Sequence, residues 1–334
     1  MVTFSANGKH LLGGGWHGVR VWQVQDGQHI ATLQAGNISC LALSRDGNWI
    51  AAGAAGTWTG KVLVWDAKTY EKVFSHTMEN LVCHVSGVDF SPDSSRLVSA
   101  SDNHTAAVWD MTTRKQVHTL RDKDWVSAVR YSPQGDRIAT ATRNSVRVWD
   151  SNDATLVADI KVTVAPLYNT SLLWVDNDLF VVSEGAVQRL ESSTGSTLSE
   201  WPVPDTSDYS CVALPKHGKF IACSGEYTVS FWDTSTYSLI GQIQYTRLVY
   251  PIVSIAFSQD DRFLAISSRD GKIFFKDLKD GLTASYSLVS IVYWRTRWTR
   301  KLIPLFFRLH SLRALPLPCS IHGNTTASET QKHR

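Results

Sequence analysis

The residues with the most obvious potential for chemistry form a glycine-rich segment at 53–61, with the sequence GAAGTWTGK. A nucleotide-binding loop needs Gly-x-x-x-x-Gly-Lys-Ser/Thr between a strand and a helix, because its backbone amides cradle phosphates and its lysine contacts them. Here the first glycine is one place off, Val62 follows the lysine, and a strand-like run comes next. The segment therefore predicts an enlarged loop between two strands. The Gly13-Gly14-Gly15 run occupies an equivalent place and has the same interpretation.

The other chemically active residue types show no arrangement typical of a metal site or a catalytic site. The eleven histidines lack metal-ligand spacing: His76 and His84 are eight residues apart on an expected connecting loop, and Cys83-His84 has no partners. No Gly-x-Ser-x-Gly elbow occurs, and no carboxylate is repeated at equivalent positions that would line a catalytic tunnel. The sequence therefore predicts a protein without catalytic residues, metal or cofactor.

The elements that must position any site are short strands, and residues 129–150 show them best. Val129-Arg130-Tyr131-Ser132 alternates apolar with polar residues, and the turn formers at 133–136 follow. Residues 137–142 and Val146-Arg147-Val148-Trp149 then indicate two further strands joined by a tight turn. A meander of three strands cannot bury both of its faces, so neighbouring copies are required.

Such copies recur along the chain. Their strand ends stand at positions 22, 65, 109, 149, 190, 232 and 276, in steps of 40 to 44 residues. Trp-Asp ends four of the copies and Lys276-Asp277 is a half match, whereas the fifth copy, around Leu190, is degenerate. A period of about 40–45 residues with a terminal Trp-Asp is typical of four-stranded propeller blades.

On these residues the chain resembles the WD-repeat (WD-40 type) β-propeller family over about residues 1–288. The resemblance implies an all-β fold: a seven-bladed propeller of four-stranded antiparallel blades. It also implies that a fourth apolar segment between copies, such as residues 30–33, is an outer strand contributed to the following blade. Residues 282–288 are then expected to supply the missing outer strand and close the ring.

The family pattern also assigns structural residues. Aromatic plugs between blades are expected at the strand ends, namely at Trp22, Trp65, Trp109, Trp149 and Trp232. A buried set of His, Ser/Thr, Asp and Trp is expected in each blade, but Gln34, Leu81, Asp122 and Asp205 replace the histidine in four copies. The aspartate survives clearly only at Asp270, with Asn103 and Glu226 as substitutes. Blade five should therefore be the weakest, and the blades should depend mainly on apolar packing.

Partner contacts are expected from the loops before the first strand and after the second strand of each blade, which reach one rim. Exposed aromatic residues and arginines are typical of interface hot spots. On this rim the sequence places Trp16, Trp58, Asp124, Trp125, Arg143, Tyr209, Tyr250 and Arg269. Trp125 is the first choice for mutation.

The last segment, residues 289–334, has no repeat pattern and is expected to be a disordered or loosely packed basic tail. Residues 282–334 carry eight Lys/Arg and one acid, which leaves 25 basic and 29 acidic groups in residues 1–281. The propeller body therefore has no electrostatic footprint for nucleic acid. Neither apolar run of the tail approaches the ~20 residues of a membrane span.

Together these features predict a non-catalytic scaffold that binds partner proteins or peptides through the loops of one face. The alternative is a membrane-peripheral propeller anchored by the basic-aromatic tail, with weak membrane-surface contact. Five cysteines without paired spacing and the lack of a signal segment favour the cytoplasm or the nucleus.

Overall fold

The computed structural model of the chain describes residues 1–55, 59–78, 84–162, 171–183, 186–202, 211–217, 219–245, 248, 250–280 and 291–292. Within them the chain forms 28 strands and one short 3-10 helix, η1 (Leu278–Asp280). The strands are β1 (Val2–Phe4), β2 (His10–Gly15), β3 (Gly18–Gln23), β4 (His29–Gln34), β5 (Asn37–Leu43), β6 (Trp49–Ala55), β7 (Gly60–Asp66), β8 (Lys72–Thr77), β9 (Val85–Phe90), β10 (Arg96–Ser101), β11 (Thr105–Asp110), β12 (Lys115–Arg121), β13 (Ala128–Tyr131), β14 (Arg137–Ala141), β15 (Ser145–Asp150), β16 (Leu156–Lys161), β17 (Ser171–Val175), β18 (Asp178–Ser183), β19 (Ala186–Glu191), β20 (Thr197–Pro202), β21 (Cys211–Ala213), β22 (Phe220–Ser224), β23 (Thr228–Asp233), β24 (Leu239–Gln244), β25 (Ile252–Phe257), β26 (Phe263–Ser268), β27 (Ile273–Asp277) and β28 (Ile291–Val292).

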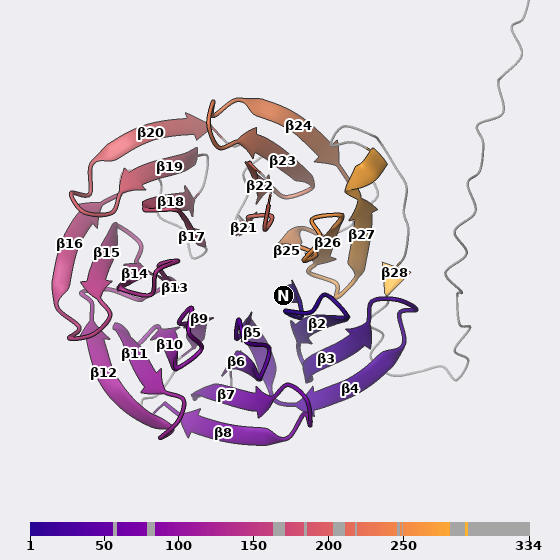
Figure 1. The fold of residues 1–334 in the computed structure, drawn as a ribbon, viewed down its shortest axis with the longest axis horizontal. Coiled ribbons are helices and arrows are strands. Elements are labelled where there is room, and N and C mark those ends of the chain that lie inside the picture. The colour runs from indigo at the N-terminus through magenta and orange to yellow at the C-terminus, as the bar shows by residue number, and fades with distance from the viewer. Residues whose placement is uncertain are drawn as a thin grey trace, which may run out of the picture. The chain divides into compact units, whose positions relative to one another are not determined.

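These strands form seven antiparallel sheets of four strands each, arranged in a ring (Figure 1). Four consecutive strands make each sheet, and the first strand lies toward the centre while the fourth lies at the circumference. The predicted all-β, seven-bladed propeller is therefore confirmed. Blade one holds β1 to β4, and the blades follow in chain order to blade seven with β25 to β28.

Antiparallel pairing sorts the connections onto two faces of the ring. The turns after the first and third strands of each blade emerge on one face, which we call the turn rim. The loops after the second and fourth strands emerge on the opposite face, which we call the loop rim. The turn rim includes residues 5–9, 44–48, 91–95 and 132–136; the loop rim includes residues 16–17, 102–104, 122–127, 142–144 and 269–272.

A serine and an acidic or amide side chain fix the turn after the first strand in five blades. In blade three the Ser91 hydroxyl donates to Asp93 Oδ1 at 2.5 Å, and the Arg96 amide donates to Ser91 Oγ at 2.9 Å. At the turns that begin at Ser5, Ser44 and Ser258 the serine donates to the side chain two residues on, whereas Ser132 donates to Asp136, four residues on. In each of these turns the serine oxygen accepts the backbone amide five residues on. These hydrogen bonds satisfy backbone groups that would otherwise lack partners, which is why the Ser-x-Asp grammar recurs with the repeat.

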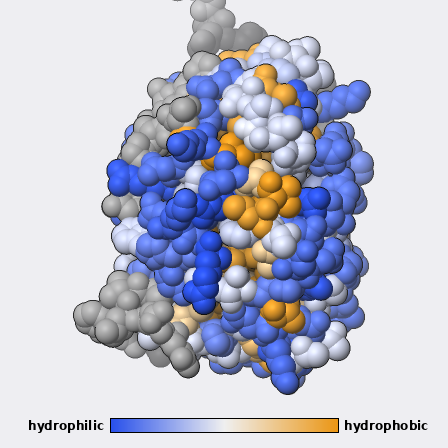
Figure 2. Space-filling view, turned by 90° about the vertical axis from the view of Figure 1, so that its left-hand side faces the viewer, coloured by the Kyte–Doolittle hydropathy of each residue, from blue (hydrophilic) through white to orange (hydrophobic). Residues whose placement is uncertain are grey.

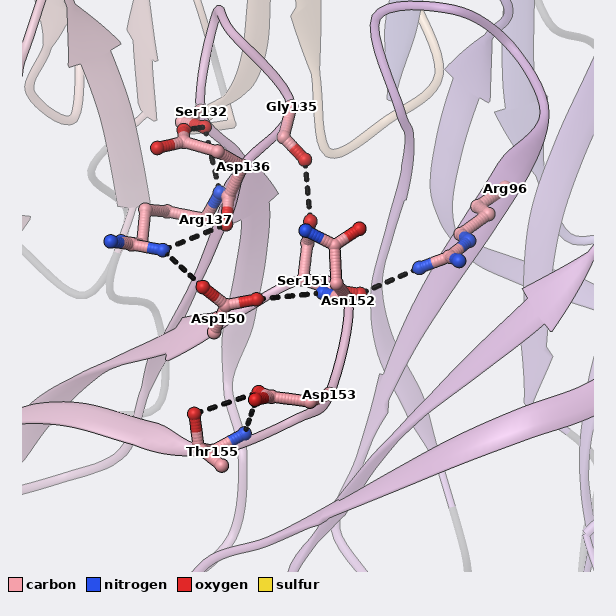
Figure 3. Close-up of polar contacts among 10 residues, drawn as sticks. All are labelled: Arg96, Ser132, Gly135, Asp136, Arg137, Asp150, Ser151, Asn152, Asp153 and Thr155. Atoms are coloured by element: carbon pink, nitrogen blue, oxygen red, sulfur yellow. Dashed lines mark hydrogen bonds and ion pairs between the residues drawn. The ribbon is translucent and has the colours of Figure 1, made fainter.

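The aspartate that ends the third strand has a similar local role. In blade four the Asn152 amide donates to Asp150 Oδ1 at 2.9 Å, and Arg137 forms an ion pair with Asp150 at 2.5 Å (Figure 3). Arg96 of blade three reaches across to donate to the Ser151 carbonyl at 2.6 Å (Figure 3). The Asp of the Trp-Asp pair therefore stabilises the turn into the outer strand.

Among the described residues the hydrophobic core consists of seven clusters, one at each interface between neighbouring blades. The third-strand tryptophans lie in these clusters and pack against the preceding blade: Trp65, for example, is 2% exposed and lies with Val19 and Val21 of blade one. Trp22 of blade one lies with Ile273 of blade seven, so the ring closes through apolar packing. In the same slot blade five has Leu190 and blade seven has Lys276, both buried.

The outer strands differ from the arrangement that the sequence predicted. The fourth strand belongs to the same blade as the three strands before it in sequence; β4, for example, pairs with β3. The expectation that this strand joins the following blade was therefore wrong. The reason is that a short turn at the third strand's end leads straight into antiparallel pairing. The predicted closing segment, residues 282–288, lies outside the described residues, and β28 occupies the outer position of blade seven.

Contacts divide the chain into two compact units, residues 1–297 and 298–334. The second unit lies wholly outside the described residues. The boundary expected between residues 288 and 289 stays a prediction.

Candidate functional site

The loop rim carries three large exposed aromatic side chains. Trp16 lies between β2 and β3 and is 75% exposed, Trp125 lies between β12 and β13 and is 49% exposed, and Tyr250 lies just before β25 and is 48% exposed. The other large exposed apolar residues lie in outer strands: Ile30, Val117, Leu156, Val157, Leu198, Leu239 and Ile240. Among the described residues, exposed aromatic side chains of this size are therefore a feature of the loop rim.

The outer strands present a different surface. Figure 2 looks onto the side of the ring where β16 lies, and it shows small apolar areas set among hydrophilic side chains. Leu156 and Val157 of β16 are 48% and 41% exposed. Single exposed aliphatic residues are ordinary on protein surfaces.

The remaining residues of the predicted partner surface divide into described and undescribed positions. Arg143, in the β14–β15 turn, and Arg269, in the β26–β27 turn, are exposed on the loop rim. Asp124 is partly buried, and its Oδ1 accepts a hydrogen bond from the Trp125 amide at 2.8 Å. Trp58 and Tyr209 lie outside the described residues.

A buried ion pair holds the loop that carries Trp125. Arg147 Nη1 lies 2.5 Å from Asp122 Oδ1, and the two side chains are only 6% and 2% exposed. Arg147 Nη2 also lies 3.1 Å from Asp159, whose side chain is 40% exposed. The start of the 122–127 loop is thereby fixed to β15 and β16 of blade four, two residues before the Asp124-Trp125 pair.

The sequence indicated Asp122 only as a residue that replaces an expected histidine. Two signals pointed further: an acid stands where the family pattern has a buried polar residue, and Arg147 interrupts the apolar residues of a strand. Pairing them requires knowing that the loop folds over blade four, which sequence spacing alone does not show.

Five tryptophans predicted to be structural are all buried, but their indole nitrogens differ. Trp109 donates to Ser99 Oγ at 2.9 Å and Trp149 donates to Thr140 Oγ1 at 2.9 Å. The Trp232 nitrogen has no partner among the described residues, because Cys223 occupies the position of Ser99 in its blade. Among the described residues, blades three and four thus show the Ser/Thr–Trp link of the family's buried hydrogen-bond set.

Asp270 is the family-pattern aspartate that the sequence retains, and it stabilises the β26–β27 turn. It accepts a hydrogen bond from the Ser268 hydroxyl, and the Lys272 ammonium lies 2.6 Å from its Oδ2. Partial burial favours the neutral acid, but the hydrogen bonds from Lys272 and Ser268 outweigh burial and lower the pKa of Asp270. Its contacts are local to blade seven.

The segments first considered for chemistry have structural places. Residues 53–55 end β6, residues 60–61 begin β7, and the loop between them lies mostly outside the described residues. The Gly13–Gly15 run lies within β2, so the expectation of a loop there was wrong; Gly13 is needed because a Cβ would lie 2.9 Å from the Trp22 ring. His76 lies in β8 against Trp109, with ring centroids 4.6 Å apart, so placing it in a connecting loop was also wrong.

No group of three or more potential metal ligands occurs among the described residues. Cys40, Cys211 and Cys223 are free, and burial raises the pKa of the Cys211 thiol to about 11. Such a thiol is a poor nucleophile because little thiolate is present at neutral pH. Within the described part of the chain, no helix is both long and apolar enough to cross a membrane. The predicted tail lies outside this part except for β28, so the membrane-peripheral alternative stays a prediction.

Seven four-stranded blades with buried aromatic residues between them define the class of this protein as a seven-bladed β-propeller. A family model described as "WD domain, G-beta repeat" matches residues 27–66, 74–110, 114–150 and 245–275. The chain belongs to the WD40 repeat β-propeller family. The matched segments leave out β1 to β3 of blade one and all of the strands of blades five and six.

Two relatives illustrate how far the sequence similarity extends. Periodic tryptophan protein 2 of Arabidopsis thaliana is 24% identical over 262 residues, which cover 76% of this chain and 28% of the relative. Small ribosomal subunit protein RACK1y of Oryza sativa subsp. japonica is 30% identical over 128 residues, covering 36% of this chain and 37% of the relative. The matches thus span 28% and 37% of the two relatives' lengths.

Solved structures agree on the fold. A chain of the Mitotic Checkpoint Complex superposes with a TM-score of 0.72 at 17% identity, covering 83% of this chain and 86% of that chain. A chain of Kuenenia stuttgartiensis Hydrazine Synthase superposes with a TM-score of 0.63 at 15% identity, covering 72% and 77%. Because the second belongs to an enzyme, the fold by itself does not decide between binding and catalysis.

Proposed function

We propose that this protein is a non-catalytic scaffold that binds a partner protein or peptide through its loop rim. The observation that carries the proposal is the exposure of Trp16, Trp125 and Tyr250 on one rim, while the third-strand tryptophans are buried between blades. A large aromatic side chain in water is unfavourable unless it contributes elsewhere, and interface hot spots are enriched in Trp, Tyr and Arg. Membership of the WD40 repeat family supports the general role.

The charge around Trp125 favours a partner segment that is acidic. Arg121, Lys123, Arg143 and Lys161 are exposed at the loop-rim ends of blades three and four. Of the carboxylates in this loop, Asp122 is neutralised by Arg147 and Asp124 accepts the Trp125 amide. An acidic partner segment with an apolar contact for Trp125 would match this surface in charge, and opposite charge also accelerates association.

The geometry of the Trp125 loop supports recognition without a large rearrangement. The buried Arg147–Asp122 pair fixes the start of the loop, and Val126, at its end, is completely buried. A side chain presented from a fixed backbone loses less conformational entropy on binding than one on a loose loop. We infer that Trp125 is the principal anchor of the partner.

The test uses full-length protein with three single variants: Trp125→Ala, Trp16→Ala and, as a matched control, Val117→Ala on an outer strand, where the side chain is 44% exposed. Partners are identified by quantitative co-purification and then purified for affinity measurement. We expect Trp125→Ala to raise the Kd by about 30-fold or more, the loss of a hot spot, with an unchanged melt. An unchanged Kd for both tryptophan variants, or an equal loss for Val117→Ala, would refute the proposal.

We also propose that the protein has no catalytic role. We propose its cellular compartment from the names of the relatives. Two relatives are named as small ribosomal subunit proteins, which agrees with the expectation of a cytoplasmic or nuclear protein. Fluorescence microscopy of the full-length chain tests this, and an exclusively extracellular signal contradicts it.

A further inference from the structure

A cavity of about 640 Å³ lies at the turn-rim end of the central channel, on the face opposite to the exposed aromatic side chains. Its walls come from the innermost strands of six blades and from the residues that directly follow them. These strands are β1, β5, β9, β13, β21 and β25. A volume of this size lies within the range of small-molecule sites in proteins, roughly 300–1,000 Å³.

Three cations from three different blades converge on this cavity. Arg45 follows β5 of blade two, Arg130 lies in β13 of blade four, and Lys216 follows β21 of blade six. None of them lies within 4 Å of a carboxylate in the part of the chain that the structure describes. Arg130 Nη1 donates to the Val129 carbonyl at 2.8 Å, which leaves its other donors available.

One carboxylate, Asp89, also lines the cavity. Its Oδ2 accepts a hydrogen bond from the Tyr131 amide at 2.8 Å. Burial raises the pKa of Asp89, and the positive charges of Arg130 and Arg45 oppose this. The cavity therefore carries three cations against one acid whose negative charge burial disfavours.

The acids beside the cations are already occupied by local hydrogen bonds. Asp46, next to Arg45, accepts from the Ser44 hydroxyl at 2.6 Å. Asp261 accepts from the backbone amides of Lys216 and the following histidine, each at 2.6 Å. These contacts anchor the backbone on both sides of the cavity, so the cations are presented from fixed turns.

We propose that this end of the channel binds a soluble small molecule that carries two or more phosphate groups. Arginine and lysine are the residues that proteins use for phosphate. Phe4, Leu43 and Phe257 also line the cavity and offer contacts for an organic moiety. Concave walls with charge of one sign also concentrate the opposite ion.

The test is isothermal titration of the full-length protein with inorganic tripolyphosphate, with inorganic phosphate as the less charged comparison. The variants are Arg45→Gln, Arg130→Gln, Lys216→Gln and Asp89→Asn. The control is Lys219→Gln, which removes an exposed lysine three residues after Lys216 that does not line the cavity.

We expect saturable binding of one tripolyphosphate, weaker at about 0.5 M than at about 0.05 M salt because screening reduces the attraction. Each cation variant should weaken binding by about tenfold or more, the usual loss of a hydrogen bond to a charged group. Asp89→Asn should bind more tightly, since it removes the only acid of the cavity among the described residues. Inorganic phosphate should bind more weakly than tripolyphosphate.

A titration that shows no saturable binding up to about 1 mM tripolyphosphate would overturn the proposal. So would equal losses in Lys219→Gln and the cation variants, or binding only to vesicles that contain phosphoinositides. Arg45 is exposed, so Arg45→Gln keeps the test interpretable if the Arg130 variant unfolds. Trp125→Ala should bind tripolyphosphate normally, which separates this site from the loop-rim proposal.

Discussion

Removing Arg147 should destabilise this propeller more than removing its principal partner, Asp122. The Arg147 and Asp122 side chains are 6% and 2% exposed, and their charged atoms lie 2.5 Å apart. Arg147→Met leaves the Asp122 carboxylate buried without a cation in contact, a situation that typically costs about 3–5 kcal/mol. One oxygen of Asp122, Oδ2, already lacks a hydrogen-bond partner among the described residues, so nothing there compensates for the loss.

The reverse substitution should cost less. In Asp122→Asn the guanidinium keeps Asp159 at 3.1 Å, and the 40% exposed side chain of Asp159 is close to solvent. The amide oxygen of Asn can still accept from Arg147, so the loss should be about 1–3 kcal/mol, the range for a weakened buried hydrogen bond. The double variant Asp122→Leu/Arg147→Met should lie near wild type, because an apolar pair often replaces a buried ion pair at little cost.

Urea unfolding followed by tryptophan fluorescence measures these differences as midpoint shifts at constant m-value. The expected order of destabilisation is Arg147→Met first, Asp122→Asn second and the double variant last. In the double-mutant cycle, whose single variants are Asp122→Leu and Arg147→Met, we expect a strong favourable coupling. The outcome that would refute the reasoning is a cost below about 1 kcal/mol for Arg147→Met, or a double variant whose loss equals the sum of the single losses.

Two further perturbations test the structural roles of the repeat residues. Trp149→Ala should cost about 3–5 kcal/mol of stability because a large buried side chain is truncated. Thr140→Val should cost only about 1–3 kcal/mol because it removes just the acceptor that lies 2.9 Å from the indole nitrogen. Thermal melts of both variants check this order, and equal losses would contradict the packing role of Trp149. Hydrogen bonds from the Ser235 side chain and from the backbone amides of Thr236 and Ser235 lower the pKa of Asp233 to about 2. Because this pKa lies below the value of 3.8 for an unperturbed aspartate, the stability that Asp233 contributes is present above about pH 4 and is lost as the pH falls toward 2. In melts across this range Asp233→Asn should flatten the acid limb, and an identical pH profile for wild type and variant would count against the assignment.

The sequence predicted the repeat architecture well because the signal is local. Ser-x-Asp turns and Val-Trp-Asp strand ends each satisfy hydrogen bonds within about ten residues, so they recur wherever the blade recurs. Trp16, Trp125 and Tyr250 are exposed on the loop rim, and their role in partner binding stays a prediction.

What the sequence did not predict depends on contacts between distant residues. The Arg147–Asp122 pair joins residues 25 apart in sequence, and the cavity cations come from three separate blades. No periodic pattern contains them, because each occurs once in the ring. The role of β28 was missed for a related reason: two residues of a pattern-free segment complete blade seven only because β27 has an open edge.

The seven blade interfaces do not satisfy their buried polar groups equally, and this bears on how the ring opens. Around blades five and six the indole nitrogens of Trp174, Trp201 and Trp232 and the hydroxyl of Ser199 are buried without a partner among the described residues. Each such group costs about 1–3 kcal/mol relative to a satisfied one. Trp109 and Trp149, by contrast, donate to hydroxyls in blades three and four, where the buried atoms without a partner among the described residues are Asp122 Oδ2, the Tyr131 hydroxyl and Arg147 Nε.

Local opening should therefore begin at blades five and six, in agreement with the degenerate repeat of blade five. The consequence for function lies in the placement of the aromatic anchors. Trp16 belongs to blade one and Trp125 joins blades three and four, and the third-strand tryptophans of these blades pack in interblade clusters. Opening that begins at blades five and six would then start outside the blades that carry Trp16 and Trp125.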